Sequence, residues 1–291
     1  MKIGIVTDTS SGITFEEANK LGISLISLPF IIDEKEYLDK DVTKEEFYKL
    51  LNDANSIHTS QSPIETVINV LKDNLEKYDQ ILYLPIEKGL SSTYETSVLM
   101  QNEEPFNGKV FVVDHGSISC MMRKNIYDII SLINKGYDAG RIKDIIEKRN
   151  GKNIVYIIVE TLENLRKGGR ISSLVAATGN LLQIKPIMFS DGGKFDMVKK
   201  ARNFDKAKEM MLSLFEEDLK DKFNDTNVNN YNIGLAYVND INKANEFKEM
   251  FLNKYPEYNK EIIIDELAPV IACHIGEGAL GFTFNKVMDE S

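Results

Sequence analysis

Apolar segments of strand length alternate with segments of helical periodicity along most of this 291-residue chain. The run from Ile154 to Val159 is continuously apolar, which is typical of a strand covered on both faces. Repeated strand–helix order predicts an α/β fold with a largely parallel sheet. Strands are expected over residues 2–7, 24–30, 80–85, 109–114, 153–159, 186–190, 232–238, 261–264 and 280–284.

Two helices between these strands have recognisable sequence signals at their ends. Ser62 before Pro63 predicts a helix start with Ser62 as the N-cap, Pro63 at the first helical position and Glu65 completing a capping box. A second helix is expected over Ser117–Asn134, ended by Gly136. Helices of this length can connect parallel strands.

The pattern changes after about residue 150. Asp191-Gly192-Gly193-Lys194 predicts a hairpin turn between strands at 187–190 and 195–198. We therefore expect two domains: an N-terminal three-layer parallel-sheet domain over 1–152 and a C-terminal α/β sheet-and-helix domain over 153–291.

Charge and composition exclude several classes of protein. Forty-five acidic against 35 basic residues give a net charge of −10, which disfavours nucleic acid as a partner. Cys120 and Cys273 have no CxxC spacing, so neither a disulfide framework nor a zinc site is indicated, and both are expected to be buried. With three histidines and no acidic cluster at ligand spacing, no metal site is expected. No apolar run resembles a signal peptide or a membrane span, and the expected location is the cytoplasm.

Hydroxyl-rich segments follow several predicted strands, where ligands bind in a parallel α/β sheet. The segment Thr7–Gly12 includes Asp8, and it can serve either a ligand or the cap of a helix starting near Thr14. Thr59, Ser60 and Gln61 precede the helix that Ser62 can cap alone, so we favour an anion-binding role for them.

A second such segment contains Ser91, Ser92 and Thr93 and precedes another predicted helix. Two hydroxyl-rich helix starts beyond two strand ends would converge on one small acidic group. The segment lacks the G-x-S-x-G pattern of a serine hydrolase.

Two glycine-containing segments complete the candidates. Lys167-Gly168-Gly169-Arg170 reads by itself as a helix end with a solvated arginine. Gly276 and Gly278 belong to a formal G-x-G-x-x-G with no room for a βαβ unit, so a dinucleotide site is not expected. We expect these glycines to let the backbone approach a ligand or a neighbouring loop closely. The adjacent His274 is either a structural histidine or faces the same ligand.

Taken in order, these segments resemble the DegV family of bacterial fatty-acid-binding proteins over nearly the whole chain. The resemblance rests on Thr7–Ser10, Thr59–Gln61, Leu90–Tyr94, Lys167–Ser172, Ile184–Pro186, Ala201–Arg202 and His274–Gly281.

The resemblance implies two α/β domains that clasp one long-chain fatty acid, such as palmitate, in a tunnel between them. It places Thr59 and Ser91 on the carboxylate, with His274 in the surrounding network. No catalytic residue, metal or other cofactor is implied. Supporting roles are expected for Asp8, Ser60, Gln61, Ser92, Thr93, Arg170, Gly276 and Gly278.

The family's role implies a partner. The protein would present its fatty acid to a separate fatty acid kinase, which makes acyl phosphate for phospholipid synthesis. Arg170 and Arg202 are then expected to dock the kinase or, briefly, an anionic membrane.

The sequence departs from the family pattern at Glu87, Lys88, Ser92, His115 and Glu277, which leaves the acyl chain length and the kinase pairing open. Two alternatives also stay open: an α/β enzyme acting on a small anion, as a phosphotransferase or hydrolase, and a lipid-responsive regulator without a kinase. Paired carboxylates, a nucleophile with its base and a P-loop are all missing from the sequence, which weighs against the enzyme.

Overall fold

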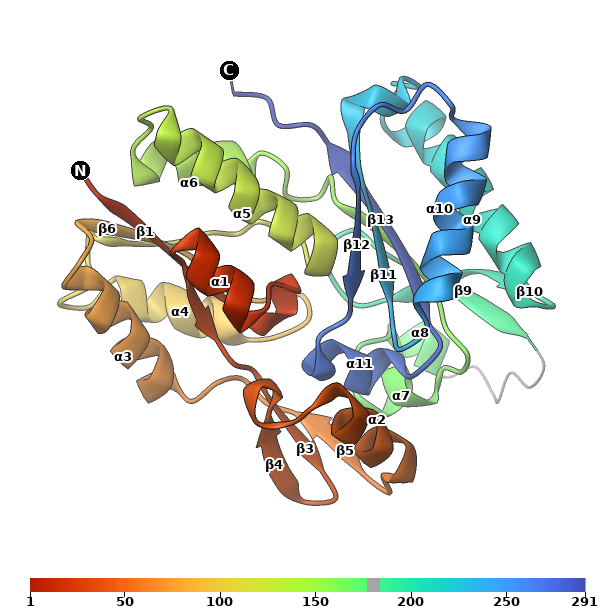
Figure 1. Cartoon of the computed structure of the whole chain (residues 1–291), viewed down its shortest axis with the longest axis horizontal. Coiled ribbons are helices and arrows are strands. Elements are labelled where there is room, and N and C mark those ends of the chain that lie inside the picture. The colour runs from red at the N-terminus through yellow and green to blue at the C-terminus, as the bar shows by residue number, and fades with distance from the viewer. Residues whose placement is uncertain (177–183, 291) are drawn as a thin grey trace.

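The computed structural model describes residues 1–176 and 184–290, and its strands form three sheets there (Figure 1). We call them the parallel sheet, the small sheet and the large sheet. Strand–helix alternation along the chain produces this arrangement, and the predicted α/β class is confirmed. The division into domains at residue 152 stays a prediction.

The parallel sheet has the order β2-β1-β6-β7 and is parallel throughout. Ile5 and Leu82 pack toward α1, α5 and α6, whereas Val6 and Ile81 pack toward α3 and α4. Both faces are thus covered, which explains the continuously apolar strands. The elements are β1 (Ile3–Asp8), α1 (Phe15–Leu21), β2 (Ser24–Ile26), α3 (Ile64–Leu75), β6 (Gln80–Leu84), α4 (Thr93–Gln101), β7 (Val110–Val112), α5 (Ser119–Asn134) and α6 (Ala139–Glu147).

The large sheet has the order β10-β9-β8-β13-β11-β12, and only the β11–β12 pair is parallel among its described strands. Helices α9 and α10 cover its outer face, where Phe215, Phe251 and Phe282 pack together. The predicted hairpin at 191–194 joins β9 to β10. The elements are β8 (Ile154–Ile158), β9 (Lys185–Ser190), β10 (Asp196–Ala201), α9 (Phe204–Glu217), β11 (Tyr231–Tyr237), α10 (Ile241–Lys254), β12 (Ile262–Glu266) and β13 (Leu280–Lys286).

The small sheet, in the order β4-β3-β5, was not predicted. We expected one strand over 24–30, but the chain leaves the parallel sheet after Ile26 and enters the small sheet at Pro29. Between them, the Leu28 N–H donates to Thr9 Oγ1 at 3.2 Å, outside any strand ladder. The elements are β3 (Pro29–Ile32), β4 (Lys35–Leu38), α2 (Lys44–Asp53) and β5 (Ile57–Thr59).

The predicted cap of α3 is wrong in detail. Ser62 donates its hydroxyl to the Ser27 carbonyl at 2.6 Å, so Pro63 is the N-cap and makes no side-chain cap bond. The reason is tertiary: Ser27 lies where the chain passes between two sheets, and its carbonyl competes for the Ser62 hydroxyl.

The remaining short elements lie around the large sheet and the strand ends. Helix α11 packs between the small sheet and the inner face of the large sheet, together with α7. Cys120 and Cys273 are buried, as predicted, and neither forms a disulfide. Among the helices that the structure describes, none is both long and apolar enough to cross a bilayer. The short elements are η1 (Thr9–Ser11), η2 (Asp39–Asp41), α7 (Glu163–Lys167), α8 (Ser173–Ala176), η3 (Asp218–Lys222), η4 (Val228–Asn230) and α11 (Pro269–Ile275).

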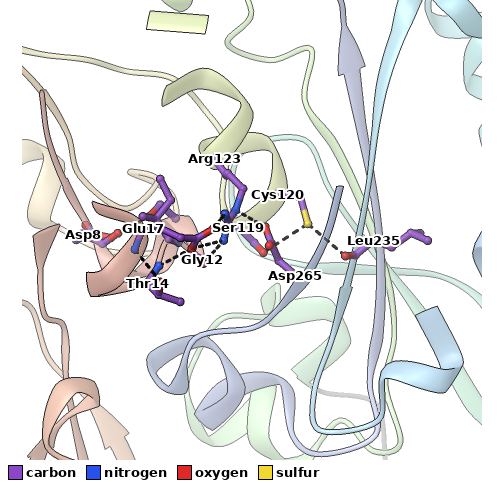
Figure 2. A network of polar contacts seen from close by, with 11 residues as sticks. Asp8, Gly12, Thr14, Glu17, Ser119, Cys120, Arg123, Leu235 and Asp265 are labelled. Atoms are coloured by element: carbon purple, nitrogen blue, oxygen red, sulfur yellow. Dashed lines mark hydrogen bonds and ion pairs between the residues drawn. The ribbon is translucent and has the colours of Figure 1, made fainter. Parts of the chain in front are cut away.

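An ion-pair network built on Arg123 of α5 joins the parallel sheet's helices to the large sheet (Figure 2). The Arg123 guanidinium donates from Nε to Asp265 Oδ2 at 2.8 Å and from Nη1 to Glu17 Oε1 at 2.7 Å. It also donates to the Gly12 carbonyl. Burial raises the pKa of Asp265 to about 6, although the arginine acts in the opposite direction.

Candidate functional site

A cavity of about 280 Å³ lies in the core shared by the small sheet, α11 and the inner face of the large sheet. This volume is close to the lower end of the range for small-molecule sites, about 300–1,000 Å³. Most of its wall is aliphatic, including Ile86, Ile118, Val155, Ile157, Val270 and Ile271. Such a wall suits an apolar ligand.

Polar side chains gather at the part of the cavity next to α11 and β5. Thr59 Oγ1, at the end of β5, lies 2.7 Å from Nε2 of His274 in α11. Burial lowers the pKa of His274 to about 4, and the charge of Arg170 acts in the same direction. His274 is therefore neutral at pH 7 and can hold the Thr59 hydroxyl without adding a charge.

Gly168, at the end of α7, makes room for the His274 ring. A Cβ at Gly168 would stand 2.0 Å from His274 Nδ1, although the backbone conformation of Gly168 is an ordinary helical one. The glycine is required for space rather than for conformational freedom. The segment that we read as a helix end thus lies directly against α11.

Arg170 turns from this segment toward the cavity. Its guanidinium donates from Nε to the Leu90 carbonyl at 3.2 Å and from Nη1 to the Gly168 carbonyl at 2.5 Å. Partial burial lowers its pKa from the ordinary value. Among the described residues that line the cavity, Arg170 is the only one with a charge at pH 7. One side chain thus supplies a positive charge and braces the Leu90 loop.

The Ser91 loop, to which Arg170 donates through the Leu90 carbonyl, also lines the polar end. Ser91 Oγ lies 2.9 Å from Thr93 Oγ1 and accepts from the Thr93 N–H, the first of α4, at 3.3 Å. A Cβ at Gly89 would stand 2.4 Å from the Cα of Gly193, so this loop packs closely on the β9–β10 turn. Thr93 is buried behind Ser91 and does not reach the cavity.

The structure separates the predicted site residues into two groups. The group at the cavity consists of Thr59, Ser60, Gln61, Ser91, Ser92, Arg170 and His274. The group outside its lining consists of Asp8, Thr93, Arg202, Gly276 and Gly278.

Asp8 supports the wall from behind. It is fully buried and accepts from the Ile86 N–H at 2.6 Å and from the Ser10 hydroxyl at 2.5 Å. Burial raises its pKa to about 6. Ile86 lines the cavity and Asp8 does not, so Asp8 holds one residue of the wall from outside the lining.

Gly276 and Gly278 shape the connection from α11 to β13. Both have positive φ, 83° and 77°, which favours glycine. A Cβ at Gly276 would stand 2.8 Å from Nδ2 of Asn164. Arg202 follows β10 and is exposed. None of these three positions belongs to the lining of the cavity.

Of the departures from the family pattern, only Ser92 lines the cavity. Lys88 pairs with Asp114, and Glu277 accepts from Asn239 Nδ2 at 2.5 Å. His115 is buried, and burial lowers its pKa to about 4.

The sequence missed the apolar wall and two buried hydroxyls, Ser119 and Thr283, that also line the cavity. Alternation along two predicted strands could have grouped the lining residues of the large sheet. Val155 and Ile157 share one face of β8, and Gly281 and Thr283 share one face of β13. Periodicity alone could not say which face encloses a cavity.

The chemistry of the lining restricts what the cavity can do. No carboxylate or thiol is among the described residues that line it. Over residues 1–176 and 184–290, no group of His, Cys, Asp and Glu is arranged to hold a metal ion. The arrangement can bind and neutralise an anionic head group attached to an apolar chain.

Comparisons with known proteins give one consistent family. The model of the DegV family, described as "uncharacterised protein, DegV family", matches residues 2–287. A DegV domain-containing protein of Staphylococcus aureus is 29% identical over 286 residues, covering 97% of this chain and 98% of the relative. One of Clostridium acetobutylicum is 29% identical over 290 residues, covering 98% of each chain.

Solved structures agree with this result. A DegV family protein of Thermus thermophilus, described by its fatty acid binding, has a TM-score of 0.86 and 27% identity over 99% of this chain and 100% of its own. A fatty-acid-binding DegV family protein of Streptococcus agalactiae has a TM-score of 0.85 and 26% identity over 99% of both chains.

Proposed function

This chain belongs to the DegV family, and we propose on that premise that it binds one long-chain fatty acid in the cavity. The observation that carries the proposal is the composition of the cavity wall. It is aliphatic over most of its extent, and the hydroxyls of Thr59 and Ser91 gather with the neutral His274 and with Arg170 at one end. Relatives in Thermus thermophilus and Streptococcus agalactiae are described as fatty-acid binders.

The carboxylate would lie among Thr59, Ser91, His274 and Arg170. In the neutral tautomer with hydrogen on Nε2, His274 donates to Thr59 Oγ1 and leaves the Thr59 hydrogen for the ligand. Ser91 supplies a second hydroxyl donor, and Arg170 offsets the negative charge. Together these groups avoid the cost of an unpaired buried carboxylate.

The aliphatic wall would take the tail. Each buried methylene contributes about 0.8 kcal/mol, so a tail of about sixteen carbons, as in palmitate, gains on the order of 10 kcal/mol before ordering costs. A small anion would leave this wall unused, which weighs against the alternative of a small-anion enzyme.

We further propose that the protein does no chemistry itself and works in the cytoplasm with a fatty acid kinase. Ser60, Gln61 and Ser92 line the polar end and are exposed, so the carboxylate would be reachable from outside. The kinase would transfer the terminal phosphoryl group of ATP to the carboxylate oxygen, giving acyl phosphate for phospholipid synthesis and ADP. Arg202, exposed after β10, would help to dock the kinase or briefly an anionic membrane.

The test is the lipid content of the purified protein. Native mass spectrometry should find one long-chain fatty acid per chain, and the delipidated protein should take up palmitate stoichiometrically. A Thr59→Ala, Ser91→Ala double variant should lose the co-purified lipid, whereas Thr66→Ala, at an exposed position of α3, should keep it. A delipidated protein that is folded and takes up no fatty acid would refute the proposal. Formation of acyl phosphate only when this protein, the kinase and ATP are combined tests the partnership.

A further inference from the structure

Thr283, in the middle of β13, is a buried polar residue that the proposed carboxylate site does not use. It is 4% exposed and lines the cavity, and its Oγ1 has no hydrogen-bond partner in the described structure. A threonine hydroxyl enclosed in this way is rare, because an unsatisfied buried polar group is costly. Thr283 belongs to the wall of the cavity in which we propose that the acyl chain lies.

Thr283 lies away from the polar end. Its strand partners are Gly234 of β11 and Val155 of β8, so it is central in the large sheet. Gly281, which also lines the cavity, is two residues closer to the connection from α11. Two residues of strand span about 6.6 Å. Because its cross-strand neighbour Val155 also lines the cavity, Thr283 lies beside an aliphatic part of the wall.

The start of α5 lies beside Thr283. A Cβ built on Gly234 would stand 2.5 Å from Cys120 Cβ and 2.9 Å from Thr283 Cγ2, so both side chains pack directly against this glycine. Ser119, the first residue of α5, is 3% exposed and also lines the cavity. Its hydroxyl is 3.8 Å from Cys120 Sγ, which is only a weak partner (Figure 2).

The N-terminus of α5 adds to the polarity of this region. The helix runs for 16 residues from Ser119 to Asn134, and its N-cap, Ile118, makes no side-chain cap bond. Ile118 lines the cavity as well. The first N–H groups of a helix carry partial positive charge and favour an oxygen acceptor nearby.

We propose that Thr283, Ser119 and the start of α5 form a second polar subsite, which selects an acyl chain carrying a hydroxyl group along its length. The inference rests on the proposed fatty acid binding and deepens it by naming a class of fatty acid. A ligand hydroxyl can donate to one protein hydroxyl and accept from the other, as neither Thr283 nor Ser119 is restricted to one role. A methylene at the same place would leave Thr283 without a partner.

The subsite suits a neutral hydroxyl rather than a second carboxylate. Arg170, the only charged residue in the described lining, belongs to the other polar region. A carboxylate buried beside Thr283 would have no cation to offset it.

The experiment compares the delipidated wild-type protein with stearate and with stearates hydroxylated at successive carbons from mid-chain to the distal end. We expect a narrow range of positions to bind about tenfold more tightly than isomers hydroxylated elsewhere on the tail, since only those positions reach Thr283. Equal affinities for all distal isomers would overturn the proposal and leave fatty acid binding intact. Failure of stearate and of every isomer to bind would overturn both proposals.

Variants provide the second readout. Thr283→Val keeps the side-chain shape, and it should abolish the positional preference while binding stearate at least as tightly. Thr283→Ser should retain the preference. Thr7→Val makes the same change in buried β1, outside the cavity lining, and should also retain it. A preference that survives in Thr283→Val would overturn the assignment to Thr283. If Thr283→Val fails to fold, the wild-type series decides the question.

Discussion

Thr59 Oγ1 and His274 Nε2 lie 2.7 Å apart and join β5 to α11 across 215 residues of chain. Neither side chain has this partner until the small sheet packs against α11. The polar end of the cavity is thus a product of tertiary packing, and the first four predictions below test how its parts depend on one another and on the rest of the chain.

Removing either proposed carboxylate hydroxyl should weaken fatty acid binding. A hydrogen bond to a charged group contributes roughly 1.5–3 kcal/mol, so Thr59→Ala and Ser91→Ala should each lower palmitate affinity about ten- to a hundredfold. Isothermal titration calorimetry on delipidated protein measures the change, and Thr66→Ala serves as the control. An unchanged affinity in the double variant would refute the assignment.

Gly168→Ala should act through His274. The added methyl group would stand 2.0 Å from the ring, so the histidine must move away from Thr59. We expect lower palmitate affinity, with little further loss when His274→Ala is added, because both changes remove one interaction. Gly193→Ala is the matched control, as its Cβ would meet nothing within 4 Å and its φ is not in the left-handed range. Additive losses in the double variant would contradict the coupling.

Substituting Arg170 should impair fatty acid binding, whereas substituting Arg202 should impair presentation of the bound fatty acid to the kinase. Arg170→Ala should lower palmitate affinity about tenfold or more and leave the affinity for the matching fatty alcohol nearly unchanged, because only the acid needs the charge. Equal losses for acid and alcohol would instead indicate that Arg170 mainly braces the Leu90 carbonyl.

In the same comparison, Arg202→Ala should keep palmitate affinity and slow acyl phosphate formation by the kinase, most strongly at low salt. Loss of lipid binding in Arg202→Ala with normal kinase coupling would refute the docking role.

The neutral state of His274 should make part of the stability depend on pH. Its pKa is about 4 in the folded chain, below the value of about 6.5 expected when unfolded. Between these values the unfolded chain binds a proton that the folded chain does not, so the free energy of unfolding falls as pH decreases from about 6.5 to 4.

Asp8 and Asp265 act in the opposite direction, because burial raises their pKa values to about 6 and the folded chain takes up their protons first. The comparison must therefore be between wild type and His274→Gln, in which both carboxyl groups and His115 are kept. Urea unfolding across this pH range should show a steeper loss in wild type. Parallel curves would contradict the prediction.

Arg123→Ala should destabilise the whole molecule. Its guanidinium bridges Glu17 and Asp265, and its removal would leave a buried carboxyl without its cation. Breaking a buried ion pair from one side costs about 3–5 kcal/mol, which urea unfolding would detect. Lys20→Ala removes an exposed pair with Glu16, where the side chains are 71% and 79% exposed, and should cost at most about 0.5 kcal/mol. Similar losses for both variants would refute the role of Arg123.

The sequence by itself determined the alternation of elements and therefore the α/β class. In strand-length runs such as Ile154–Val159, the local sequence alone indicates that both faces of the strand are buried. The ordered hydroxyl and glycine segments identify the family. Thr59, Ser91 and His274 could be named because they stand in those segments. All three line one cavity.

Tertiary structure alone decided how these segments meet. The expected strand over 24–30 divides between two sheets, Ser62 bonds to Ser27 instead of capping α3, and Asp8 supports Ile86 from behind. Each outcome depends on a partner supplied by another part of the chain, which local propensity does not encode. The need for Gly168 likewise arises only when the His274 ring packs on it, and Thr283 acquires its buried position only when the large sheet and α5 enclose it. Local patterns specify which face of a strand is apolar, whereas the packing of distant segments decides what that face encloses.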